Sequence, residues 1–302
     1  MKTLTAQPCS LPPGRLCEGP VWDDRTQELL WVDIPAGQIH CAVMDVDGTA
    51  VDLRHRSTRR FIGPVSAVLP SASGGLIATM RDTVVRIDEL GAVTPITVLP
   101  LPEDGIRRRL NDAKVDPRGR LLTGSMSEDE ITGTAALYQV DSHGRARELR
   151  TGVTISNGLG WSPDGGTLYY ADTPTGRVDA FDYDVETGTI SNGRPFVSFD
   201  YGLPDGLSVA SDGSVWVAVW DGGQVRAFNP DGEPCAVVEV GASQVTSCAF
   251  AGPDLDILVI TTAAQGPTGE PDAGRLFTCR PGLTGLAVTP YADARAVRAG
   301  DR

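Results

Sequence analysis

The sequence predicts an all-β fold, a six-bladed β-propeller with four-stranded blades, from three observations. Six segments of the 302-residue chain repeat one layout: a β-rich run, a polar step and a second β-rich run. Their starts lie about 40 to 50 residues apart, which is the usual spacing of propeller blades. No window shows a sustained helical period of apolar residues, and the 35 glycines and 22 prolines spread along the chain indicate many turns.

The repeats divide the chain into units of similar composition. They begin at Leu29, Gly75, Arg120, Thr167, Ser214 and Asp256. A further short strand precedes each repeat, at 18–22, 64–70, 111–117, 157–163, 205–211 and 246–252. These units leave only short ends, so we expect a single propeller domain over 1–302 in which the two termini together complete one blade and hide its edge strands. A pair of β-sandwiches is the alternative.

Composition restricts the class of partner. The chain has 26 basic and 39 acidic residues and a net charge of −13. This balance disfavours nucleic acid and an anionic membrane surface as partners, because both need a basic face. No stretch approaches the ~18 apolar residues of a membrane span, and the N-terminus lacks the apolar run of a signal peptide.

The cysteines give no metal or disulfide motif. Six cysteines occur without a C-x-x-C pair. We therefore expect reduced thiols and a cytoplasmic protein, with a Cys9–Cys17 disulfide as the alternative. His40, His55 and His143 are the only histidines, which limits any mechanism that needs a histidine base.

Polar residues occupy one matching position in four of the six short strands. These residues are Glu18, Asn111, Asn157 and Asp205, while blades two and six have about Val65 and Thr246. The first strand of a blade lines the central channel, so these oxygens should point toward the axis. Burying them is costly unless a cation pairs with them, and carboxylate and amide oxygens suit Ca²⁺, Mg²⁺ or Mn²⁺, with Zn²⁺ also able to use them. The alternative is that they are turn and cap residues, since Asn-Gly and Asp-Gly are common turn pairs.

Five ordered motifs then carry a family resemblance. They read EGPVW, RLNDAKVDPRGRLLTGSM, SNGLGWSPDGGTLYYADT, PDGLSVASDGSVWVAVWDGGQVRAFNPDG and VTSCAF. In this order they resemble the SMP-30/gluconolactonase/regucalcin-like family from about Cys17 to Phe277. The resemblance implies a six-bladed propeller with one divalent metal ion in the channel mouth, and many members of this family hydrolyse sugar lactones.

The resemblance also implies roles for single residues. Glu18, Asn157 and Asp205 correspond to the metal ligands. Arg109 and Asn111 correspond to the pair that orients the substrate, with Arg107 and Arg108 as neighbours that leave the register open. Some relatives have a glutamate in the loop after the GTM motif. Here the sequence SMSED places Asp129 or Glu128 in that loop as a further substrate-binding residue.

A lactone is a cyclic ester, so its hydrolysis needs an activated water and a polarised carbonyl, and a divalent ion supplies both. Asp205 is the candidate general base, and its competing role is as a ligand only. Arg109 and Asn111 suit a polyol, which favours a sugar-derived lactone such as gluconolactone or a pentonolactone. The alternatives are a calcium-binding regulatory protein and an interaction scaffold, neither of which turns over a substrate. The sequence does not specify the oligomeric state.

Overall fold

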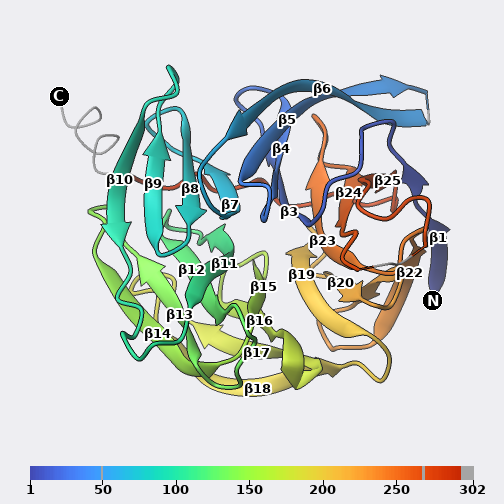
Figure 1. The fold of residues 1–302 in the computed structure, drawn as a ribbon. Helices are drawn as coiled ribbons and strands as arrows, with labels where there is room; N and C mark the ends of the chain where they lie inside the picture. The colour runs from blue at the N-terminus through green and yellow to red at the C-terminus, as the bar shows by residue number, and fades with distance from the viewer. Residues whose placement is uncertain (49, 267–268, 294–302) are drawn as a thin grey trace.

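Six β-sheets stand around a central axis, and the predicted six-bladed propeller is confirmed (Figure 1). The structure is a computed structural model that describes residues 1–48, 50–266 and 269–293. Within these residues the one helical element is the 3₁₀ turn η1 (Thr173–Thr175), and no helix is long and apolar enough to cross a membrane.

Each blade is an antiparallel meander that runs outward from the axis. Blade one contains β3 (Cys17–Asp23), β4 (Glu28–Asp33), β5 (Gln38–Asp47) and β6 (Ala50–Arg60). Blade two contains β7 (Val65–Pro70), β8 (Leu76–Met80), β9 (Thr83–Ile87) and β10 (Val93–Val98). Blade three contains β11 (Arg108–Val115), β12 (Leu121–Ser127), β13 (Ala135–Val140) and β14 (Ala146–Val153).

The second half of the ring repeats this order. Blade four contains β15 (Ser156–Trp161), β16 (Thr167–Asp172), β17 (Arg177–Tyr183) and β18 (Ile190–Ser198). Blade five contains β19 (Leu203–Val209), β20 (Val215–Trp220), β21 (Gln224–Phe228) and β22 (Pro234–Glu239). Blade six takes β23 (Val245–Ala251), β24 (Ile257–Thr262) and β25 (Phe277–Cys279) from the end of the chain.

The two ends of the chain close the ring together, as the sequence predicts. The outermost strand of blade six is β2 (Gln7–Pro8), which pairs antiparallel with β25. The sequence did not indicate a second contact, in which β1 (Lys2–Thr5) pairs parallel with β22 and gives blade five a fifth strand. Both pairings cover strand edges that would otherwise offer free backbone groups to another chain.

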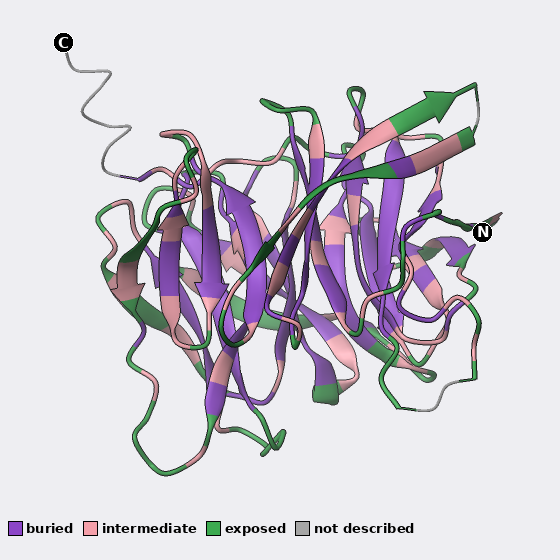
Figure 2. Cartoon of the chain, turned by 45° about the horizontal axis from the view of Figure 1, so that its top comes forward, coloured by how far each residue is buried: buried purple, intermediate pink, exposed green. Residues whose placement is uncertain are grey.

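The apolar core lies between neighbouring blades. Figure 2 shows buried residues along the inner strands and exposed residues along the outer ones. All residues of β7 and β15 are buried, whereas β18 is mostly exposed. All six cysteines are free and most are buried, so the alternative of a Cys9–Cys17 disulfide is wrong. The core therefore consists of apolar layers between the blades, and the innermost strands line the channel along the axis.

Residues 283–293, here named the C-terminal strap, cross one mouth of the channel. The strap begins at blades five and six, where Gly285 forms a bridge with Ala210 and its N–H donates to Leu255 O. It ends at blade two, where the buried Tyr291 forms a bridge with Ser71. The strap therefore leaves the opposite mouth as the open one.

Removal of the N-terminal strands tests the closure of the ring. We expect a variant without residues 1–8 to lose about 2 kcal/mol or more of unfolding free energy, equivalent to about 4 to 8 °C in Tm. The reason is that blade six then lacks its outermost strand. Thermal unfolding measures this loss. A variant without residues 1–5 is the control, because it keeps β2 and should lose less. Equal losses in the two variants would contradict the proposed role of β2.

Candidate metal and substrate site

Every innermost strand breaks its hydrogen-bond register at one level of the channel. The breaks lie between Glu18 and Val21, Val65 and Ala67, Leu110 and Ala113, Ser156 and Leu159, Pro204 and Leu207, and Val245 and Ser247. A β-bulge leaves its extra residue unpaired and re-aims the side chain. Six bulges at one level therefore turn one set of side chains out of the blades and toward the axis.

The predicted residues lie at these bulges, with one offset. Asn111, Asn157 and Asp205 are bulge residues, whereas Glu18 stands one position before the bulge of its strand. The matching register expected for all four residues is therefore wrong for Glu18. In blade two the bulge residue is Ser66, not Val65, and in blade six it is Thr246 as expected.

Two bulges need glycine as their second residue because the next blade is close. A Cβ atom on Gly158 would lie 2.5 Å from Asp205 O, and one on Gly206 would lie 2.2 Å from Ser247 Oγ. The turn pairs Asn157-Gly158 and Asp205-Gly206 thus have a packing role inside a strand. In blade three the corresponding residue is Asp112, which places another carboxylate in the channel.

A chain of hydrogen bonds fixes the orientation of the two asparagine amides. The Thr173 hydroxyl donates to Pro204 O (2.8 Å), so its oxygen accepts from Asn157 Nδ2 (2.7 Å). The opposite atom, Asn157 Oδ1, accepts from Asn111 Nδ2 (2.6 Å), which also donates to Ser156 O (2.9 Å). A carbonyl oxygen has a second lone pair, so Asn157 Oδ1 can still bind a cation.

Glu18 and Asp205 are buried carboxylates that no ion pair compensates within the described residues. Burial, followed by repulsion from Asp112, raises the pKa of Glu18 to about 8. Burial and the nearby charge of Glu18 raise the pKa of Asp205 well above its usual value. Asp205 Oδ1 is buried and has no hydrogen-bond partner in the described chain.

These residues fit a divalent cation. Two buried carboxylates and an amide oxygen are ligands that Ca²⁺, Mg²⁺ and Mn²⁺ accept. Nowhere in the described ranges do three His, Cys, Asp or Glu side chains group closely enough to hold a metal, so a cation here needs the amide of Asn157. The unpartnered Oδ1 of Asp205 is an oxygen with which such a cation could pair.

Arg109 is a basic residue beside the cluster formed by Glu18, Asn111, Asn157 and Asp205. Its Nη1 donates to Asn111 Oδ1 (2.6 Å) and Leu110 O (3.0 Å). Burial lowers the pKa of Arg109, and the nearby carboxylates, including Glu18 and Asp205, oppose that shift. Because the guanidinium has further hydrogens, it can also donate to a ligand in the mouth.

The three consecutive arginines, Arg107, Arg108 and Arg109, have different partners. Arg108 is buried and binds Asp104 (2.6 and 2.7 Å) and Thr134 O (2.7 Å), so its role is structural. Arg107 is exposed and pairs with Glu128 (3.1 Å). Only Arg109 of the three is hydrogen-bonded to Asn111, so it stays the predicted partner of Asn111.

The loop after β12 contains Asp129, the predicted substrate-binding residue, between two further carboxylates. Asp129 is exposed in the turn that follows the strand. The loop carboxylates that act on the pKa of Arg109 are Glu128 and Glu130. Glu130 also has a positive φ of 54°, which bends the loop sharply. Asp129 stays a predicted substrate-binding residue, and its two neighbours are the candidates that sequence reasoning weighed less or missed.

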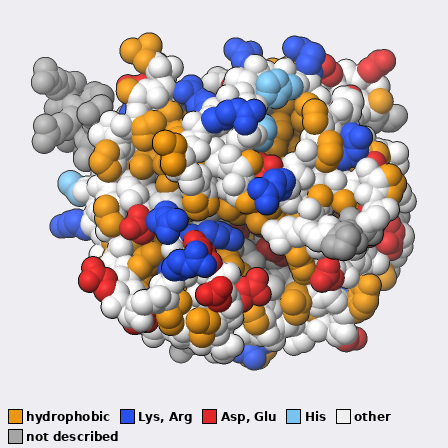
Figure 3. All heavy atoms as spheres, in the orientation of Figure 1, with side chains coloured by type: hydrophobic (Ala, Val, Ile, Leu, Met, Phe, Trp, Pro, Cys, Tyr) orange, Lys and Arg blue, Asp and Glu red, His pale blue; other side chains and the backbone are white. Residues whose placement is uncertain are grey.

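Seen from the side drawn in Figure 3, the surface is hollowed near the centre of the ring, and acidic and basic side chains lie together beside the hollow. The fold and the cluster define a class: six-bladed propellers with carboxylate and amide oxygens turned into the channel. The chain matches the model of the SMP-30/gluconolactonase/LRE-like region over residues 16–264 and belongs to this family.

Named relatives lie within this family. The candidate sugar lactone lactonase YvrE of Bacillus subtilis (strain 168) is 34% identical over 91% of this chain and 94% of its own length. Regucalcin of Homo sapiens is 34% identical over 95% of this chain and 97% of its own length. The solved structure of regucalcin from Agrobacterium tumefaciens, described as a calcium-binding protein, has a TM-score of 0.86 at 26% identity and covers 96% of this chain and 99% of its own.

Neutralising Glu18 should stabilise the cation-free protein. The pKa of Glu18 is near 4.5 in the unfolded chain and about 8 in the folded one, so between these values the folded state binds more protons. The unfolding free energy of the protein must therefore fall as pH rises through this window. We expect E18Q in chelator to reduce that slope and to gain about 1 to 3 kcal/mol at pH 8. Urea unfolding at pH 6 and pH 8 measures both effects.

The control is E103Q, in which the exposed carboxylate of Glu103 is neutralised. This variant should keep the slope of the unmodified protein. An E18Q protein with an unchanged slope, or with lower stability at pH 8, would show that Glu18 is not an uncompensated charge.

Proposed function

We propose that this protein hydrolyses a sugar-derived lactone to the open-chain sugar acid and that it depends on one divalent cation held by Glu18, Asn157 and Asp205. The substrate class is an aldonolactone such as gluconolactone or a pentonolactone. The observation that carries the proposal is the unpartnered, buried Oδ1 of Asp205 in a cluster with Glu18 and Arg109. The name of YvrE and the family model support a lactonase.

The reaction adds water to the ester carbonyl and breaks the ring C–O bond. A divalent cation (Ca²⁺, Zn²⁺, Mn²⁺ or Mg²⁺) supplies, when bound, a lower pKa for water and polarisation of the carbonyl. Asp205 accepts the proton of the attacking water through its carboxylate, whose Oδ1 has no hydrogen-bond partner in the described chain.

Arg109 and Asn111 hold the substrate. The Nδ2 group of Asn111 donates its two hydrogens to Ser156 O and Asn157 Oδ1. Asn111 can therefore bind a ligand only through Oδ1, as an acceptor. The donors for the hydroxyl or ring oxygens then come from Arg109. An acidic side chain of the loop after β12, Asp129 or one of its neighbours, would accept from a sugar hydroxyl. This polar pattern favours a polyol over an alkyl ester.

A calcium-binding regulatory protein is the second candidate, because regucalcin relatives match nearly the whole chain. Both candidates need the cation, and only the lactonase needs turnover. A proton-release screen against aldonolactones, with chelated protein and with each divalent ion added back, separates them. Chelator-sensitive turnover supports the lactonase. Cation binding without turnover of any lactone supports the regulatory protein.

Asp205→Asn separates base from ligand. The substitution keeps the size and one oxygen of the side chain but removes its ability to take a proton. We expect kcat to fall by roughly 10² or more at saturating cation, the usual loss for a general base. Steady-state kinetics with occupancy checked by direct metal analysis measures this effect.

The control is D182N, because Asp182 is exposed on blade four and bonds Asn192 and Arg194 there. It should leave kcat unchanged. Recovery of the Asp205→Asn rate by added cation would assign Asp205 a ligand role only, and wild-type kinetics at confirmed occupancy would move the chemistry elsewhere.

A further inference from the structure

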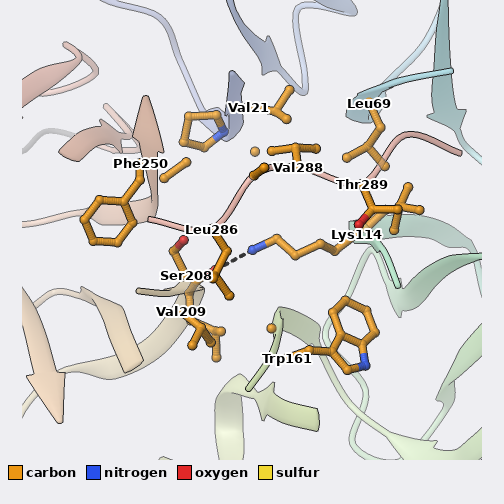
Figure 4. A pocket seen from close by; sticks show the side chains of 18 of the residues that line it. Val21, Leu69, Lys114, Trp161, Ser208, Val209, Phe250, Leu286, Val288 and Thr289 are labelled. Carbon is orange, nitrogen blue, oxygen red and sulfur yellow. Dashed lines mark hydrogen bonds between the residues drawn. The ribbon is translucent and has the colours of Figure 1, made fainter. Parts of the chain in front are cut away.

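A separate cavity of about 350 Å³ lies in the channel between the bulges and the C-terminal strap. All six inner strands contribute to its wall, and Leu286, Val288 and Thr289 of the strap form part of its boundary (Figure 4). None of Glu18, Asn111, Asn157 and Asp205 is part of this lining. The bulges therefore divide the channel into the oxygen cluster on one side and a second compartment on the other.

The wall of this compartment is mainly apolar. Side chains from different blades meet there, among them Val21, Leu69, Trp161, Val209 and Phe250. The strap adds Leu286, which is 36% exposed, beside the cavity. An apolar cavity of this size with a few converging polar groups is typical of a small-molecule site.

Lys114 is the polar group that extends into the compartment. Figure 4 shows its side chain reaching from blade three toward blade five, where Nζ donates to Leu207 O at 2.8 Å. An ammonium group carries three hydrogens, and the described chain provides a hydrogen-bond acceptor for one of them. The other donors are available to a ligand that has an acceptor oxygen.

An acidic residue, Asp112, lies beside Lys114 in the same compartment. Asp112 stands two residues before Lys114 on β11 and also lines the cavity. Each of the two groups favours the charged form of the other. Together they are neutral, whether the shared proton sits on the amine or on the carboxyl. A carboxylate ligand would therefore bring an unpaired negative charge into a mainly apolar compartment, which is costly.

We propose that this compartment binds a neutral amphiphile, whose carbonyl or hydroxyl oxygen accepts a hydrogen bond from Lys114 and whose alkyl chain lies against Val209, Phe250 and Val288. A chain of about six to eight carbons fits a cavity of this volume. The ligand enters beside the strap, on the side of the channel opposite the cation cluster. The proposal does not depend on lactone hydrolysis, because the two compartments have separate linings.

The test uses 2-octanone as the neutral probe and octanoate as its charged counterpart. Lys2 and Lys114 are the only lysines of the chain, so protein labelled with [ε-¹³C]lysine gives two signals by NMR. We expect 2-octanone to shift the Lys114 signal in a saturable way and to leave Lys2 unchanged, because Lys2 is exposed and bonds Pro281 O. Octanoate should bind at least tenfold more weakly.

Variants locate the site. K114M removes the donor and should weaken 2-octanone binding about three- to tenfold by calorimetry, the loss expected for one hydrogen bond. K2M is the matched control and should bind normally. A249F fills the cavity from blade six and V288F fills it from the strap, so each should abolish binding. Thermal unfolding confirms that each variant is folded, and the two filling variants report independently if one of them fails to fold.

Three results would overturn the proposal. Folded wild-type protein that shows neither heat nor a Lys114 shift with 2-octanone has no such site. Octanoate that binds as tightly as 2-octanone contradicts the charge argument. Normal binding by a folded A249F or V288F places the probe elsewhere on the protein. E18Q should bind 2-octanone normally, so loss of the cation site and loss of this site can be told apart.

Discussion

The break in hydrogen-bond register at one level of all six inner strands is the constraint on which the site depends. A regular ladder would alternate side chains between the two faces of each blade and leave few of them for the axis. The bulges release Asn111, Asn157 and Asp205 from that alternation. The blades also pack closely at this level, so Gly158 and Gly206 cannot carry a side chain without shifting the next blade.

Hydrogen bonds then link neighbouring blades at this level. The Thr246 hydroxyl binds Cys17 O beside Glu18 (2.6 Å), and Thr173 binds Pro204 O beside Asp205 (2.8 Å). These side-chain hydrogen bonds hold neighbouring blades together at the level of Glu18 and Asp205, in addition to the packing between the blades. The cluster keeps two buried carboxylates close to each other before any cation arrives. The fold tolerates this repulsion because the apolar layers between the blades stabilise the ring independently.

Much of the fold could be predicted, because the blade repeat and the turn residues are local patterns. The closing role of the N-terminal strand was also predictable, since the last blade lacked a fourth strand. The parallel pairing of β1 with β22 and the path of the C-terminal strap were not, because both depend on contacts between segments distant in sequence. A single Tyr291 buried against blade two leaves no periodic signal in the sequence.

The residue types of the candidate site could be predicted better than its geometry. Counting backward from each repeat selected Asn157 and Asp205, which lie at bulges, but it gave a register that is off by one residue for Val65 and Glu18. Arg107, Arg108 and Arg109 are consecutive and identical in type, so no alternation of polar and apolar residues indicated which of them faces the channel. Lys114 was hidden for another reason: its significance lies in its reach across the channel to Leu207, which no sequence pattern records.

The most direct measurement is a crystal structure of this protein grown with Mn²⁺, in which anomalous scattering identifies the ion. We predict one strong peak in the channel, with Glu18, Asn157 and Asp205 each placing an oxygen within about 2.0 to 2.6 Å of it. Asp205 Oδ1 should be among these oxygens. A fully folded protein with no anomalous peak between these three residues, or with its peak bound elsewhere, would contradict the account.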